Sequence, residues 1–292
     1  MMSPDSAPPI LPFSATSLDR ASERRQDEEW LSAARADPTS RLLVLQEGVE
    51  VPVHVDGSLA WLPLDVAGED GQLIFLGVDE KERALFAWDA TAVPDSLSYA
   101  NLREVGVTLP ELDAAAALEA VAIAAWHRRH LHCAVCGVPT NPENAGHTRR
   151  CPACGAAHFP RLDPAVIMLV SDGESCVLGR RANAPANRWS TLAGYVEPGE
   201  SPEAAVAREV YEEVGLRVGA VRYRGSQPWP FPASLMLAFD ADAERAPLRI
   251  NDEHQEVRWF GRAELAAGIA DGSIATPGAI SAGGYLIRSW LG

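Results

Sequence analysis

The stretch at residues 194–216 constrains the fold of this chain more than any other, because it combines a punctuated helix with a high density of acidic residues. Ser201 is a favourable N-cap, Pro202 suits the first helical position, and Gly215 suits the position just past the last turn. These signals predict a helix over roughly residues 202–214. The second half of the chain is therefore expected to be built around this helix and its flanking loops.

Three glutamates share one face of the expected helix. Glu209, Glu212 and Glu213 are spaced i, i+3 and i+4, so they lie within a single turn. Such a cluster destabilises an isolated helix unless a cation offsets the repulsion, and Mg²⁺ and Mn²⁺ prefer oxygen ligands. A solvated acidic face, with Arg208 in surface ion pairs, is the alternative for a bare pattern of this kind. Glu200 and a glycine at either end complete a longer pattern, which favours a divalent-metal site.

Four of the five cysteines form two C-x-x-C pairs, and each pair is followed directly by glycine. In a long chain this pattern favours metal binding over disulfides. Four thiolates can close a tetrahedral Zn²⁺ shell, which leaves no position for a reactive water. The sequence therefore predicts a structural zinc site, whose ligands are Cys133, Cys136, Cys151 and Cys154.

Composition excludes several classes of protein. With 292 residues, 47% hydrophobic and 22% charged, the chain is expected to form two or more globular domains. A net charge of -15 argues against a surface that embraces nucleic acid as a whole. Five arginines against one glutamate between Trp126 and Leu162 could still face phosphates, or could form a solvated basic face. No segment resembles a membrane span or a signal peptide, so a cytoplasmic protein without a membrane partner is expected.

The chain is expected to have four parts. Residues 1–38 are rich in Pro, Ser, Asp and Arg and are expected to be a loosely ordered terminus. Residues 39–131 alternate apolar segments with turn signals and then turn helical, which predicts a small strand-rich α/β domain with a linking helix. Residues 132–160 contain the cysteines and are expected to form a zinc ribbon. In residues 161–292, strand patterns on both sides of the acidic helix predict a mixed sheet sandwiched by helices.

A proline-rich loop, SQPWPFPAS, follows the acidic helix at residues 226–234. Its three alternating prolines stiffen the backbone, and Trp229 and Phe231 offer aromatic faces. Gln227 and Ser234 offer hydrogen bonds. These properties suit the lining of a dinucleotide site, with a rigid packing loop as the alternative.

The complete acidic stretch resembles the box of the Nudix hydrolase family. Together with the four-cysteine ribbon before it and the proline-rich loop after it, the chain resembles the NADH pyrophosphatase branch of that family over about residues 133–290. The resemblance implies a Nudix α/β/α sandwich, a catalytic Mg²⁺ or Mn²⁺, and a homodimer. It also implies hydrolysis of NADH or NAD⁺ to nicotinamide mononucleotide and AMP, and removal of NAD caps from RNA.

The same resemblance assigns roles to residues. It makes Glu209 and Glu213 the main metal ligands, with the Ala193 carbonyl and Glu253 as further ligands; Glu256 competes with Glu253 for that role. Glu212 would help to bind metal or activate water, and Arg208 would orient Glu200 by a salt bridge. The expected substrate-binding residues are Phe159, Gln227, Pro228, Trp229, Pro230, Phe231, Pro232, Ala233, Ser234 and Gly283.

Three alternatives stay open at this point. One is a preference for ADP-ribose or another nucleoside diphosphate derivative. Another is a non-catalytic nucleotide sensor, and the third is a zinc-ribbon protein that binds RNA. Which glutamate serves as general base is also open.

Overall fold

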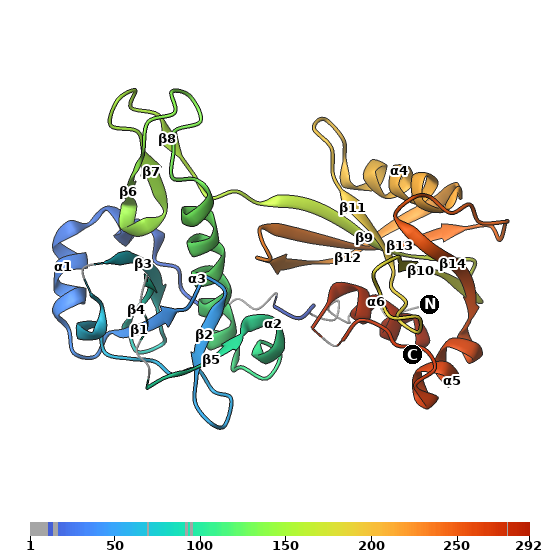
Figure 1. Cartoon of the computed structure of the whole chain (residues 1–292), viewed down its shortest axis with the longest axis horizontal. Helices are drawn as coiled ribbons and strands as arrows, with labels where there is room; N and C mark the ends of the chain where they lie inside the picture. The colour runs from blue at the N-terminus through green and yellow to red at the C-terminus, as the bar shows by residue number, and fades with distance from the viewer. Residues whose placement is uncertain (1–10, 14–16, 69, 91–92, 94–95, 279) are drawn as a thin grey trace. The chain divides into compact units, whose positions relative to one another are not determined.

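The computed structural model describes residues 11–292 except 14–16, 69, 91–92, 94–95 and 279 (Figure 1). The chain divides into two compact units. The C-terminal unit comprises Met1–Ser14, Asp163–Pro228 and Ser234–Gly292, and the N-terminal unit comprises Ala15–Leu162 and Trp229–Ala233. The zinc ribbon thus groups with the N-terminal domain, and so does the tip of the proline-rich loop.

A six-stranded mixed sheet forms the centre of the C-terminal unit. Strand β13 pairs with β9 in parallel, whereas β10 and β11 pair with β9 in antiparallel fashion. The strand order is β12-β13-β9-β10-β14, with β11 on β9 off this path. The strands are β9 (Asp163–Ser171), β10 (Ser175–Arg181), β11 (Leu192–Tyr195), β12 (Val218–Trp229), β13 (Ser234–Ala243) and β14 (His254–Gly261).

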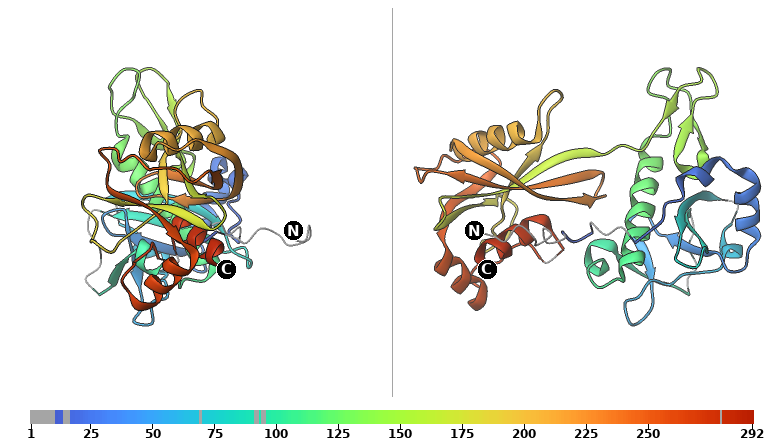
Figure 2. Two further views of the ribbon diagram at one scale, coloured as in Figure 1. Left: turned by 90° about the vertical axis from the view of Figure 1, so that its right-hand side faces the viewer. Right: turned by 180° about the vertical axis from the view of Figure 1, so that it is seen from behind.

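Helices cover both faces of this sheet (Figures 1 and 2). Alternate side chains of β9 point to opposite faces. Val166 and Met168 pack in one core with α4 (Pro202–Val214), and Ile167 packs in another with α5 (Arg262–Asp271) and α6 (Ala282–Leu291). The predicted α/β/α sandwich with a mixed sheet is therefore confirmed.

The expected acidic helix is α4, and its ends fall where the sequence places them. The Ser201 side chain accepts a hydrogen bond from the Ala204 N–H (3.2 Å), and Pro202 is the first helical residue. Gly215 ends the helix in the left-handed conformation at φ 75°, which favours glycine. The capping signals alone were sufficient to place this helix.

Besides the ribbon, the described part of the N-terminal unit contains two small sheets and a long helix. Strands β1 (Arg41–Leu45), β4 (Ala84–Ala90) and β3 (Gly71–Val78) form one sheet, and β2 (Glu50–Val53) pairs with β5 (Ser98–Asn101). The short helix α2 covers Leu102–Val105 and the long helix α3 covers Glu111–Arg129. Helix α3 packs against the first sheet and corresponds to the expected linking helix.

Residues expected to be loosely ordered include two helical segments. The 3-10 helix η1 (Ser22–Gln26) leads into α1 (Glu28–Ala36), whose N-cap Asp27 accepts the Trp30 N–H. Leu31 of α1 is fully buried. The loose order expected for residues 1–38 therefore does not hold for the helices at 22–26 and 28–36, because the buried face of α1 anchors this segment. Residues 1–10 and 14–16, which belong to the same expectation, lie outside the described residues.

The ribbon is held to α3 by a buried polar network. Its strands are β6 (Asn141–Glu143), β7 (Thr148–Arg150) and β8 (Ala157–His158), with the 3-10 helix η3 (Asn144–Gly146) between the first two. Arg149 donates to Thr140 Oγ1 (2.7 Å) and lies 2.8 Å from His127 Nδ1 of α3. Because arginine can only donate, His127 accepts at Nδ1 and donates from Nε2 to the Gly146 carbonyl (2.7 Å).

None of the helices in the described part of the chain has both the length and the apolar character that a membrane span requires.

Candidate active site

The helix α4 presents its acidic face to strand β11. A Cβ at Gly194 of β11 would overlap the Glu209 carboxylate, so only glycine lets that side chain lie against the strand. Burial, opposed by Arg208, raises the pKa of Glu209. The predicted helix face and the first glycine of the stretch are thus brought together at one point.

Arg208 connects the carboxylates of this stretch. It donates from Nε and Nη2 to the two oxygens of Glu200, both at 2.9 Å. Its Nη1 donates to Glu209 (2.8 Å) and to Glu212 (3.0 Å), and Nη2 also donates to the Tyr195 carbonyl (2.8 Å). All five guanidinium hydrogens are therefore used. The Arg208 hydrogen bonds lower the pKa of Glu200, and the Glu200 carboxylate is the main cause that raises the pKa of Arg208.

Glu213 is the most deeply buried of the acidic residues of the stretch. Its side chain is 2% exposed, and its Oε2 has no hydrogen-bond partner among the described residues. Burial, together with the negative charges of Glu209 and Glu253, raises the pKa of Glu213 to about 8. A buried carboxylate oxygen without a partner is costly unless a cation binds it. Glu213 and Glu209 together therefore fit a divalent ion.

The two candidates for the last metal ligand differ in their surroundings. Glu256 pairs with Arg180 at 3.2 Å and is 41% exposed. Glu253 instead lies close enough for its charge to raise the pKa of both Glu209 and Glu213. In the described part of the chain, the four cysteines form the only group with three or more possible ligand atoms within 4.8 Å of one another. The glutamates alone therefore do not form a complete set of metal ligands.

A pocket of about 260 Å³ opens beside Glu213. Arg181 and Arg188 bring positive charge to it, and His254 and Ala193 lie in its wall. Gly283 adjoins it, since a Cβ there would lie 2.7 Å from Thr191 Oγ1 and 3.2 Å from Ile167 Cδ1. The described residues that line it are Ile167, Gly179, Arg181, Ala184, Arg188, Ser190, Thr191, Ala193, Glu213 and His254.

The two arginines and the histidine of this pocket were not predicted from the sequence. Arg181 ends β10 and His254 begins β14, and the two are partners in the sheet register. Arg188 lies on the loop after β10, where its backbone bridges to Ala275. The one sequence signal that could have identified His254 is its position directly after the predicted metal ligand Glu253. Burial, with a smaller effect of the Arg181 charge, lowers the pKa of His254.

The proline-rich loop has two distinct parts. Gln227 is 1% exposed, and its Nε2 donates to the carbonyls of Pro12 (2.8 Å) and Ile280 (2.7 Å). Its Oε1 accepts the Ala282 N–H at the start of α6 (2.9 Å). Gln227 therefore holds segments of the chain together, and both of its Nε2 hydrogens are engaged. Ser234, at the start of β13, is also buried.

The tip of the loop groups with the N-terminal unit. Trp229 and Phe231 meet edge to face at 5.1 Å, and the Arg103 guanidinium lies 4.4 Å from the Phe231 ring centre. Pro230 is buried, while Pro228 and Pro232 are exposed and Ala233 is half-buried. Phe159 also belongs to the N-terminal unit and is 67% exposed. Substrate contacts of all these residues stay a prediction.

The four cysteines converge as the spacing predicts. Cys136 Sγ lies 3.4 Å from Cys151 Sγ and 3.6 Å from Cys154 Sγ, and Cys133 Sγ lies 3.6 Å from Cys154 Sγ. The His158 Nε2 lies 3.3 Å from Cys133 Sγ, outside the four-sulfur set. These distances fit a tetrahedral Zn²⁺ shell, in which sulfurs about 2.3 Å from the ion lie less than 4 Å apart. The group is a closed structural site.

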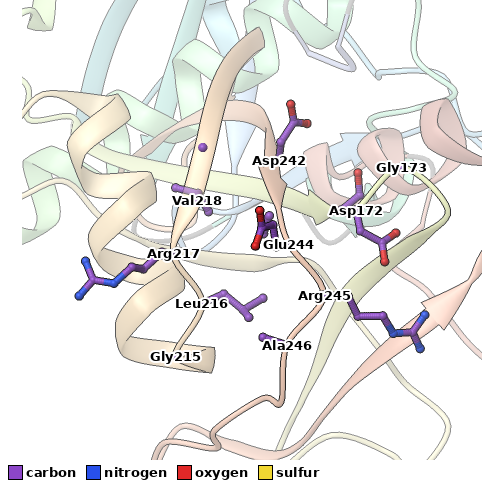
Figure 3. A pocket seen from close by; sticks show the side chains of 13 residues that line it. Asp172, Gly173, Gly215, Leu216, Arg217, Val218, Asp242, Glu244, Arg245 and Ala246 are labelled. Atoms are coloured by element: carbon purple, nitrogen blue, oxygen red, sulfur yellow. The ribbon is translucent and has the colours of Figure 1, made fainter.

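A larger groove of about 1060 Å³ lies past the C-terminal end of α4. Figure 3 shows Glu244 and Asp242 over the groove, with Arg217 and Arg245 pointing away on opposite sides. None of the acidic residues of α4 lines it. The smaller pocket beside Glu213 is therefore the candidate active site.

Comparison with known proteins identifies three regions. Residues 161–276 match the NUDIX domain, 128–159 the NADH pyrophosphatase zinc ribbon domain, and 39–126 the NADH pyrophosphatase-like rudimentary NUDIX domain. The chain is 39% identical to the NAD-capped RNA hydrolase NudC of Mycobacterium tuberculosis, over 95% of this chain and 94% of that protein. It is 31% identical to the NAD-capped RNA hydrolase NUDT12 of Homo sapiens, over 96% of this chain and 73% of that protein. A solved NUDIX hydrolase of Nitrosomonas europaea shares 26% identity at a TM-score of 0.41, over 46% of this chain and 79% of that one.

Proposed function

The chain belongs to the Nudix hydrolase family, in its NADH pyrophosphatase branch, and we propose that it hydrolyses the pyrophosphate bond of NADH and NAD⁺. The products are AMP and the nicotinamide mononucleotide. The buried Glu213 carboxylate oxygen without a hydrogen-bond partner among the described residues, next to a pocket with two arginines, is the observation that carries the proposal. A bound cation would stabilise the buried oxygen, and the two arginines of the pocket can bind the phosphates of an anionic substrate.

The reaction is a displacement at phosphorus. A water oxygen forms a new bond to one phosphorus, the bridging P–O bond breaks, and the water proton is released to a base. When bound, a divalent ion neutralises the pyrophosphate and lowers the pKa of the attacking water. The proposed ligands are Glu209, Glu213, Glu253 and the Ala193 carbonyl, and Glu212 is available to bind metal or to accept the proton.

The remaining residues orient these groups and the substrate. Arg208 fixes Glu200, Glu209 and Glu212 with charge-assisted hydrogen bonds, so their carboxylates are held before substrate binds. Arg181 and Arg188 offer forked donors that suit the phosphate oxygens. Gly283 keeps α6 close to Thr191 at the wall of the pocket, which supports its predicted place near the substrate.

We extend the proposal to RNA that carries an NAD cap. The two relatives described above are named as NAD-capped RNA hydrolases, and the match runs along 95% or more of this chain. The cap presents the same pyrophosphate linkage as free NAD⁺, so the same groups serve both reactions. The homodimer implied by the family stays a prediction, which sedimentation of the purified chain tests.

A product and substrate comparison tests the proposed function. Zinc-loaded enzyme with Mg²⁺ or Mn²⁺ is incubated in parallel with NADH, ADP-ribose and a short NAD-capped RNA. We expect AMP and reduced nicotinamide mononucleotide in equal amounts from NADH, and a higher kcat/KM for NADH than for ADP-ribose. A higher kcat/KM for ADP-ribose would replace the nicotinamide dinucleotide with that substrate. Absence of hydrolysis of all three would leave a binding protein.

A further inference from the structure

His254 is a buried side chain whose ring lies against the candidate metal site. Its side chain is 6% exposed, and its Nε2 lies 3.6 Å from Glu213 Oε2. A Cβ at Gly179 of β10 would overlap the His254 ring, so only glycine leaves room for the ring in this position. The ring is therefore fixed by the sheet beside the buried carboxylate oxygen.

The hydrogen bonds of Asn251 determine which ring nitrogen carries the hydrogen. Asn251 Oδ1 accepts the backbone N–H of Glu253 (3.1 Å), which identifies that atom as an oxygen. The same oxygen lies 3.3 Å from His254 Nδ1. Since an oxygen acceptor faces Nδ1, the hydrogen of the neutral ring lies on Nδ1. His254 Nε2 then carries no hydrogen, and its lone pair is free to accept a hydrogen bond or to bind a metal ion.

Two acceptors thus face each other in a buried place. His254 Nε2 offers a lone pair, and Glu213 Oε2 has no hydrogen-bond partner among the described residues. Their separation of 3.6 Å exceeds a hydrogen bond. Two donors each about 2.1 Å from one ion lie between about 3 and 4.2 Å apart, so the observed separation fits a shared cation.

We propose that His254 Nε2 is a ligand of the catalytic divalent ion, beside Glu213 Oε2, and that it biases the site towards Mn²⁺ over Mg²⁺. Mg²⁺ takes oxygen ligands, whereas an imidazole nitrogen suits transition metals. The hydrogen bond from Nδ1 to Asn251 is the kind of outer contact that fixes the tautomer of a metal-bound histidine. The inference rests on the proposed function only in its use of a divalent ion at Glu213.

Pulsed electron paramagnetic resonance of bound Mn²⁺ tests this inference directly. Zinc-loaded full-length enzyme is given less than one equivalent of Mn²⁺, without nucleotide, and the ¹⁴N modulation of the echo is recorded. We expect modulation from a directly bound imidazole in the wild type and in His54→Gln, which alters an exposed histidine of the N-terminal unit. His254→Leu should lose the modulation while Mn²⁺ still binds the carboxylates. Bound Mn²⁺ without ¹⁴N modulation in the wild type would overturn the proposal, and so would modulation that survives His254→Leu.

Metal titrations give a second readout. His254→Leu should raise the Kd for Mn²⁺ about tenfold or more and leave the Kd for Mg²⁺ nearly unchanged. Asn251→Ala keeps the His254 ring but removes the acceptor at Nδ1, so it should also weaken Mn²⁺ binding. Asn251→Asp keeps an acceptor oxygen and should bind Mn²⁺ like the wild type. An equal loss of Mg²⁺ and Mn²⁺ affinity in both His254→Leu and Asn251→Ala would contradict a nitrogen ligand. Both readouts need no turnover, so normal NADH hydrolysis without ¹⁴N modulation refutes this inference alone, and modulation without hydrolysis refutes the proposed function alone.

Discussion

Arg208 and Glu200 are joined by two hydrogen bonds of 2.9 Å, from Nε and Nη2 to the two carboxylate oxygens. The paired geometry requires a planar guanidinium, and lysine has none. The same side chain reaches Glu209 and Glu212, so the ion pair connects the loop before α4 to the acidic face of the helix.

Arg208→Lys should therefore lower kcat/KM for NADH by about 10- to 100-fold, because the carboxylates lose their fixed positions while the charge is kept. Arg222→Lys is the matched control, since the Arg222–Asp242 pair is about half exposed on both sides and exposed pairs contribute little. Steady-state kinetics on both variants checks this. Equal kinetics for wild type and Arg208→Lys would show that the network has no part in catalysis.

The choice between Glu253 and Glu256 as a metal ligand is open to a paired test. The charge of Glu253 raises the pKa of both Glu209 and Glu213, while Glu256 pairs with Arg180. We expect Glu253→Gln to raise the Kd for Mn²⁺ about tenfold or more and Glu256→Gln to leave it close to that of the wild type. Calorimetric titration with Mn²⁺ measures both Kd values. A larger rise for Glu256→Gln than for Glu253→Gln would make Glu256 the metal ligand.

The four-cysteine set should bind one zinc ion per chain. Cys151→Ser should abolish zinc binding and lower the melting temperature, because the free energy of zinc binding contributes to folding. Cys176→Ala is the control, since Cys176 is fully buried in β10 and burial raises the pKa of its thiol to about 12. Elemental analysis and thermal melting report the two effects. Full zinc occupancy in Cys151→Ser would contradict the assignment.

The buried His127 predicts a pH dependence of stability. Burial lowers its pKa from 6.5 to about 4. The unfolded chain therefore binds more protons than the folded chain between these values, so the stabilising contribution of neutral His127 is present above pH 6.5 and is lost as the pH falls. His127→Gln should be less stable than wild type at pH 7.5 by about 1–3 kcal/mol.

Below pH 6.5 the difference between wild type and His127→Gln should shrink by up to about 1.4 kcal/mol for each pH unit. Denaturant unfolding of the two proteins at several pH values measures it, and the zinc contribution is common to both. A difference that stays constant from pH 7.5 to 5 would show that His127 does not titrate on unfolding in this range.

The sequence was most informative where local rules decide the structure. Ser201, Pro202 and Gly215 are local capping signals, and they predicted the bounds of α4 correctly. The C-x-x-C spacing is likewise a local signal, and it predicted the four sulfurs that converge in the zinc ribbon.

The residues that were missed depend on contacts between distant strands. Arg181 and His254 come together because β10 pairs with β14 at a register shift after Arg180, which no local pattern reveals. A substrate contact of Gln227 stays a prediction, and the sequence did not predict that its amide joins the N-terminal segment to the start of α6. Its neighbours far along the chain, and not its chemistry, determine this role.

The rate at which Glu213→Gln forms AMP from NADH shows whether the buried carboxylate of α4 is needed for hydrolysis. Glutamine has nearly the shape of glutamate but lacks the charge that binds a cation, so we expect the rate to fall at least about a hundredfold with saturating Mn²⁺. Glu203→Gln, at an exposed position in the first turn of the same helix, should retain the wild-type rate. A Glu213→Gln enzyme that forms AMP as fast as the wild type would show that Glu213 does not hold the catalytic metal.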